Sequence, residues 1–274
     1  MHSTCVAAKV GTEMTTRIRL VVLGVLMLAL RGGVYGEPPK AGKNELSIRA
    51  HPQRIDFYPA QSPRQHVSVL FAPGDGGCRG FAITITEKLA KSGYDAFCLD
   101  TRHYLESFSG GQALTTAEIA SDFGEIARWV QQGRRERILL VGWSEGAGLG
   151  LAAIADPANQ EVFDGLIAIG TPEVNILAWH WTDIGASITH RLPHEATFRS
   201  AGFMSKVSPL PLFLIASTSD EYISTEATRA LFSAAREPKR LAIINGRDHK
   251  YSGNTDGFFR TLHEALHWIE QQHH

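Results

Sequence analysis

A serine in a short glycine-flanked segment is the residue best placed for chemistry in this chain. Residues 142–146 read Gly-Trp-Ser-Glu-Gly, with the apolar run Ile138–Val141 before them and a run of small residues, Ala147–Ala155, after them. A G-x-S-x-G segment between a strand and a helix predicts a sharp turn that exposes the Ser144 hydroxyl for attack on an acyl carbonyl. The glycines are needed because side chains there would prevent the turn from closing. The alternative is a glycine-rich turn whose serine has no catalytic role.

A serine hydroxyl needs a base to accept its proton, and the base needs a carboxylate to orient it. Two further apolar runs end in polar loops that contain Asp220 and His249. The chain order Ser, Asp, His is the one expected of this kind of elbow. We therefore predict Ser144 as nucleophile, His249 as base and Asp220 as the orienting acid. Glu221 and Asp248 are the alternative carboxylates, because each is adjacent in sequence to a chosen residue.

An oxyanion formed at Ser144 needs backbone N–H donors. One is expected from Glu145, at the start of the helix that follows the serine. Another is expected from Asp75 or Gly76, in the Gly-Asp-Gly-Gly segment 74–77 that ends an early strand. The alternative for this segment is an ordinary structural turn.

A second motif, His-Glu-Ala-Leu-His at residues 263–267, has the H-E-x-x-H spacing of zinc enzymes. Zinc in that setting needs a third protein ligand from further along the chain, and only the last few residues remain. The helix also lies far from the expected strand ends. We therefore predict no metal site, no cofactor and an exposed helix face.

Strands and helices alternate along the chain, and the strands are nearly continuous apolar runs. This pattern predicts an α/β fold with a mostly parallel sheet covered by helices on both faces. The expected strands are 55–58, 66–72, 95–99, 137–142, 163–170, 210–217 and 240–244, and the expected helices are 81–91, 115–132, 147–155, 224–237 and 257–272.

One insertion, 173–206, is too long for an ordinary connection and is rich in aromatic residues. It predicts a cap over the site, in which Trp179 and Trp181, together with Trp143 of the elbow, contact the substrate. The alternative is a peripheral helix pair that packs its own aromatic residues.

The N-terminus carries an export pattern. Arg17 and Arg19 precede the uncharged run 20–30, which is too short to span a bilayer but suits a signal peptide. We predict residues 1–36 as a cleaved leader, followed by a linker, 37–43, into a single domain, 37–274. The expected location is the periplasm, and an uncleaved membrane anchor is the alternative.

Charge and cysteine content limit the partners. The formal net charge of −1 shows no basic footprint for nucleic acid. Cys78 and Cys98 are the cysteines that remain once the leader is removed. An export compartment permits a disulfide between them, but two separate buried thiols are the favoured interpretation. Nothing in the sequence indicates an oligomeric state.

The residues quoted above, together with Thr101–Tyr104 and Ala117–Asp122, make the chain resemble the VirJ/AcvB bacterial virulence proteins. The resemblance implies the α/β-hydrolase fold and a periplasmic enzyme that hydrolyses a lipid ester, aminoacyl- and notably lysyl-phosphatidylglycerol, with contact at the membrane surface. Acidic residues around the site, namely Asp75, Glu145 and Glu221, favour a cationic acyl group. The alternatives are a general carboxylesterase or thioesterase acting on a soluble substrate, and a hydrolase-fold binding protein of the envelope.

Overall fold

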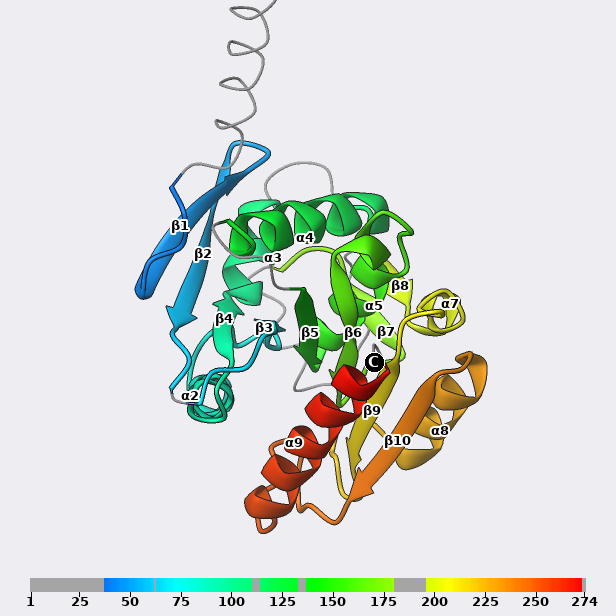
Figure 1. Cartoon of the computed structure of the whole chain (residues 1–274). Helices are drawn as coiled ribbons and strands as arrows, with labels where there is room; N and C mark the ends of the chain where they lie inside the picture. The colour runs from blue at the N-terminus through cyan, green and yellow to red at the C-terminus, as the bar shows by residue number, and fades with distance from the viewer. Residues whose placement is uncertain (1–36, 62, 110–113, 133–136, 180–195, 273–274) are drawn as a thin grey trace, which may run out of the picture. The chain divides into compact units, whose positions relative to one another are not determined.

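An eight-stranded sheet organises the chain in the computed structural model, which describes residues 37–61, 63–109, 114–132, 137–179 and 196–272 (Figure 1). The strand order is β1-β2-β4-β3-β5-β6-β9-β10, within the unit Pro38–His274. The strands are β1 (Gly42–Ile48), β2 (His51–Tyr58), β3 (Ser68–Ala72), β4 (Asp95–Leu99), β5 (Ile138–Trp143), β6 (Phe163–Ile169), β9 (Leu212–Ser217) and β10 (Lys239–Ile244).

The sheet is parallel from β4 to β10, and β1 and β2 join it antiparallel. Every residue of the central strands β3, β5, β6 and β9 is buried, which is why their sequences read as continuous apolar runs. The predicted fold class is therefore confirmed. The parallel register brings the carboxyl ends of β3, β5, β6, β9 and β10 to one edge of the sheet.

Helices cover both faces of the sheet. On one face, α2 (Phe81–Lys91) and α9 (Thr255–Gln271) pack their apolar residues against alternate residues of the central strands. The other face is covered by α5 (Glu145–Ile154), on which α4 (Thr116–Val130) packs, and α8 (Thr225–Ala234) lies against the last two strands. A shorter helix, α3 (Thr101–Ser107), directly follows β4.

The edge strand β1 is a correction to the sequence interpretation, which placed a linker over 37–43 and no strand directly after it. Only Leu46 and Ile48 of β1 are buried, because the strand lies at the sheet edge. A strand with so few buried positions leaves a weak pattern in the sequence.

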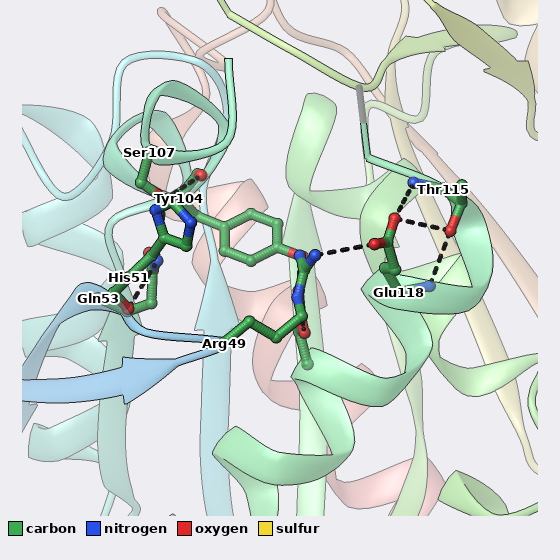
Figure 2. A network of polar contacts seen from close by, with 8 residues as sticks. Arg49, His51, Gln53, Tyr104, Ser107, Thr115 and Glu118 are labelled. Atoms are coloured by element: carbon green, nitrogen blue, oxygen red, sulfur yellow. Dashed lines mark hydrogen bonds and ion pairs between the residues drawn. The ribbon is translucent and has the colours of Figure 1, made fainter. Parts of the chain in front are cut away.

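A polar network holds the β1–β2 hairpin against α4 (Figure 2). Arg49 lies in the hairpin turn at φ 48°, and its guanidinium contacts both carboxylate oxygens of Asp122, at 2.9 and 2.7 Å. Tyr104 of α3 donates to the same carboxylate at 2.7 Å. Glu118 also accepts from Arg49 and completes a capping box with Thr115 at the start of α4. The network therefore fixes three elements at once.

The insertion predicted as a cap, 173–206, is described in part. A short two-stranded sheet, β7 (Val174–Ile176) with β8 (Thr197–Arg199), is followed by α7 (Ala201–Met204). Residues 180–195 lie outside the described residues, as does the predicted leader, 1–36. Among the helices that the structure describes, none has the length and apolar character needed to cross a bilayer.

Candidate active site

Ser144 lies on the turn between β5 and α5, at the sheet edge where the parallel strands end. Its backbone has φ 55° and ψ −125°, a conformation that residues other than glycine rarely adopt. The Ser144 N–H donates to the Ile169 carbonyl at 2.8 Å, which ties the turn to the end of β6. Gly146 must lack a side chain, because a Cβ there would overlap the carbonyl oxygens of Ala72 and Pro73. The structure thus places Ser144 on the strained turn that the sequence predicts.

Asp220 and His249 come together from the loops after β9 and β10. The His249 Nδ1 lies 2.6 Å from Asp220 Oδ2, and both side chains are buried. The other oxygen of Asp220 accepts the N–H groups of Tyr222 and Ile223, at 2.9 and 3.1 Å. The carboxylate is therefore fixed on both sides and holds the imidazole in one orientation, as an orienting acid must.

The alternative carboxylates have other contacts. Glu221 accepts the backbone N–H of His249 at 2.8 Å and so holds the loop rather than the ring. Asp248 is half-buried, and a hydrogen bond from Ser252 is the main cause that lowers the pKa of its carboxyl. Of the three carboxylates, Asp220 is the one that contacts the imidazole.

The imidazole of His249 packs against Trp143 and Gly170, close to the turn that carries Ser144. Trp143, the residue before Ser144, stacks on it with ring centroids 5.4 Å apart and planes inclined by 22°. Gly170 follows Ile169, whose carbonyl accepts the Ser144 N–H. It lies so close to the His249 ring that a Cβ on this glycine would overlap the ring. Among the described residues, His249 Nε2 is buried and has no hydrogen-bond partner. This nitrogen is the one that would accept the Ser144 proton, and such bonds often tighten only when substrate binds.

The Gly-Asp-Gly-Gly segment forms a turn against Ser144. The Gly77 N–H donates to the Gly74 carbonyl at 3.0 Å, which places Asp75 and Gly76 at the exposed centre of the turn. Gly74 is buried so close to Ser144 that a Cβ on it would lie 3.0 Å from the serine Cβ. The turn that contains Asp75 and Gly76 therefore lies beside Ser144.

Known proteins share this architecture. A family model described as the alpha/beta hydrolase fold matches residues 67–184. The chain is similar to the solved structure of Est1E from Butyrivibrio proteoclasticus, with 13% identity, a TM-score of 0.63, and 84% of this chain and 100% of that chain covered. It is also similar to a serine hydrolase without a lid from Xanthomonas campestris, with 15% identity, a TM-score of 0.59, and 84% and 95% covered. The chain has the α/β-hydrolase fold.

The chain is also similar in sequence to the uncharacterised protein YfhR of Escherichia coli strain K12, with 22% identity over 187 residues. That match covers 66% of this chain and 62% of YfhR, so the chain spans less than two thirds of the relative. The family model and the structural neighbours support the α/β-hydrolase fold.

Glu145 differs from its predicted place on an acidic rim. The side chain is buried, and its Oε1 accepts the Ile176 N–H of β7 at 2.8 Å. Burial is the main cause that raises the pKa of this carboxyl to about 8, and the negative charge of Asp75 adds to it. Glu145 is therefore mainly uncharged near neutral pH. Its side chain is buried because the start of α5 faces β7 of the insertion. Its backbone N–H remains beside Ser144.

The structure describes two of the three tryptophans predicted to contact the substrate, and both are buried. Trp143 is buried and supports His249. Trp179 is also buried, and the Arg102 guanidinium lies 4.0 Å from its ring centroid. Trp181 lies outside the described residues. Tyr222, which the sequence analysis missed, is exposed and lies edge-on to His249, with ring centroids 5.6 Å apart. Its place two residues after Asp220 is the sequence feature that could have identified it.

The two cysteines are joined. A disulfide links Cys78, directly after the Gly-Asp-Gly-Gly turn, to Cys98 in β4. The favoured interpretation of two separate thiols is therefore wrong. The two cysteines meet because β4 lies beside β3 in the sheet, so the loop after β3 passes the carboxyl end of β4.

The H-E-x-x-H motif lies on α9, which packs one face of the sheet. His263 is exposed, and its Nε2 lies 3.0 Å from that of His267. Glu270 contacts His267 Nδ1 at 3.4 Å and accepts from Tyr94 at 2.7 Å. Within the described chain, no group of three potential ligands is arranged to hold a metal.

Proposed function

We propose that the protein is a serine ester hydrolase whose catalytic residues are Ser144, His249 and Asp220. The observation that carries this proposal is the Asp220–His249 contact of 2.6 Å beside a serine on a strained elbow. Ser144 Oγ attacks the ester carbonyl while His249 Nε2 accepts its proton, and the imidazole then returns that proton to the leaving alcohol. Water hydrolyses the acyl-serine by the same route in reverse. The N–H groups of Glu145 and of Asp75 or Gly76 stabilise the oxyanion.

A fluorophosphonate probe tests the proposal, because it labels activated serines covalently. Wild-type protein should be labelled at Ser144 and should hydrolyse a short p-nitrophenyl ester, whereas Ser144→Ala should do neither. Folded wild-type protein that is neither labelled nor active would favour the alternative of a hydrolase-fold binding protein.

For the substrate, we infer an ester with a cationic acyl group, of the kind found in lysyl-phosphatidylglycerol. The resemblance to VirJ/AcvB proteins supports this inference, and so does the exposed Asp75 carboxylate in the turn beside Ser144. Glu145 is not part of the recognition, because its carboxyl is buried and mainly uncharged at neutral pH.

The experiment compares lysyl-phosphatidylglycerol with an uncharged short-chain ester. Asp75→Asn should raise KM for the lysyl lipid, and added salt should do so in wild type, while both leave the neutral ester unchanged. Asp248→Asn, which removes a half-buried carboxylate from the loop after β10, is the matched control. Equal effects on both substrates would favour a general carboxylesterase or thioesterase.

We also propose export to the periplasm with removal of residues 1–36. The arginines before a short apolar run support this, and the Cys78–Cys98 disulfide supports an oxidising compartment. N-terminal sequencing of protein from the cell envelope should begin at Glu37. A start at Met1 or Met14 would favour a retained anchor.

A further inference from the structure

The turn proposed to bind the oxyanion has little of its own to hold it in place. Three of its four residues are glycines, Gly74, Gly76 and Gly77, which gives the free segment wide conformational freedom. Within the described chain, one backbone hydrogen bond closes the turn, from the Gly77 N–H to the Gly74 carbonyl at 3.0 Å. Oxyanion donors stabilise a transition state well only when they are already in position. Some other constraint should therefore hold this turn.

The Cys78–Cys98 disulfide is placed to be that constraint. Cys78 is the first residue after the turn, two positions from Gly76. Cys98 lies in β4, is 1% exposed, and pairs in register with Phe71 of β3 and Asp56 of β2. The disulfide therefore attaches the C-terminal side of the turn to a strand held by neighbours on both sides.

The end of β4 also restricts the position of the turn through a second residue, Asp100. Asp100, two residues after Cys98, lies so close to Gly77 that a Cβ on the glycine would overlap its carboxylate. Gly77 has φ 69°, which a glycine adopts without strain. The Asp100 carboxylate is itself fixed, since it accepts the His103 N–H at 3.1 Å as the N-cap of α3. The turn thus fits against the end of β4 in one position.

We propose that the Cys78–Cys98 disulfide is a positioning element for catalysis, which holds the Asp75 and Gly76 N–H groups where the oxyanion forms. The inference rests on the proposed function. It differs from a general stabilising role, because losing the disulfide should weaken binding of the tetrahedral intermediate more than binding of the ester. Cys78 is half-buried, and dithiothreitol is the thiol chosen to reduce the disulfide. Dithiothreitol would then supply two electrons and two protons to give two thiols and become a cyclic disulfide itself, which makes the effect reversible.

The test uses Cys78→Ser together with Cys98→Ser in the full mature chain. It measures kcat and KM for a p-nitrophenyl ester and the affinity of a boronic acid, which forms a tetrahedral adduct on the serine. Loss of a single oxyanion donor lowers kcat by roughly 100- to 1000-fold. We expect kcat and boronate affinity to fall together by about 10- to 100-fold, because the donors are displaced but not removed. KM should change by less than about threefold.

Arg137→Met is the matched control for loss of stability. Arg137 pairs with Asp164 at the amino ends of β5 and β6, the sheet edge opposite Ser144. This variant should unfold at a lower temperature yet keep the wild-type kcat. If the double serine variant does not fold, folded wild-type protein is reduced with dithiothreitol instead. Activity should then fall as thiols appear, while the circular dichroism stays native, and should return on reoxidation.

The outcomes separate this inference from the proposed function. Wild-type protein with no labelling and no turnover would overturn the proposed function itself. An active wild type whose folded disulfide-free form keeps its kcat and boronate affinity would overturn only the positioning role. A change in KM alone would do the same, because it would indicate a role in ester binding.

Discussion

Replacing Glu145 by glutamine should change how the stability of the protein depends on pH. Burial raises the pKa of this carboxyl from 4.5 to about 8 in the folded protein. Between those values the folded protein keeps a proton that the unfolded chain has released. The free energy of unfolding therefore falls as pH rises from 4.5 to about 8, and the loss is complete above the folded pKa. Glutamine does not ionise, so the variant lacks this contribution.

The magnitude follows from the two pKa values. One pH unit corresponds to about 1.4 kcal/mol, so the interval from 4.5 to about 8 sets an upper limit of about 5 kcal/mol. Rearrangement around a buried carboxylate reduces that limit, and we expect roughly 2 to 4 kcal/mol. Glutamine keeps a carbonyl oxygen that can accept the Ile176 N–H, which Glu145 accepts at 2.8 Å. The substitution therefore removes the charge while keeping the contact with β7.

Urea unfolding followed by tryptophan fluorescence, at intervals from pH 5 to pH 9, measures this difference. The variant should gain stability relative to wild type as pH rises, with most of the gain between pH 6 and pH 8. Glu264→Gln, at an exposed position of α9, is the control for loss of one carboxylate. Parallel stability curves for Glu145→Gln and wild type would show that Glu145 is charged in the folded protein at neutral pH, and would refute the reasoning.

Three further predictions concern the site and its scaffold. Asp220→Asn should lower kcat for a p-nitrophenyl ester by about 10⁴-fold, while Asp248→Asn should change it little; a crippled Asp248→Asn would contradict the assignment of the acid. Gly146→Ala should cost about 3 kcal/mol or more in urea unfolding, because its Cβ would overlap backbone oxygens. Gly202→Ala, with open space around it, should cost nothing, and equal effects would argue against a closed elbow. Arg49→Met should cost about 3 kcal/mol in the same assay, because it leaves the Asp122 carboxylate buried without its ion pair; a neutral effect would mean that Tyr104 alone suffices.

Much of the fold and of the candidate site could be predicted because the evidence is local in the sequence. Buried parallel strands read as apolar runs, and the Ser144 turn and the Asp220 loop directly follow two of them. The glycines at 142 and 146 mark the elbow. Ser144, Asp220 and His249 follow one another along the chain in the order expected of nucleophile, acid and base for such an elbow. The structure then brings Asp220 and His249 together from separate strand ends.

What the sequence did not reveal depends on packing between distant segments. Glu145 reads as a surface charge, yet the insertion covers it and Ile176 bonds to it. The burial of Trp143 and Trp179 depends on His249 and Arg102, which are far away in the chain. The Cys78–Cys98 disulfide needs the order of β3 and β4 in the sheet, which neighbouring residues do not encode.

The central claim is that His249, oriented by Asp220, activates Ser144. The most direct measurement is the rate of fluorophosphonate labelling, mapped to a peptide by mass spectrometry, in wild type and in folded His249→Ala. We predict labelling of wild type on the peptide that contains Ser144, and a fall of several orders of magnitude in the His249→Ala variant, since single losses in such triads cost about 10⁴-fold or more. Labelling at another residue, or an unchanged rate without His249, would contradict the account.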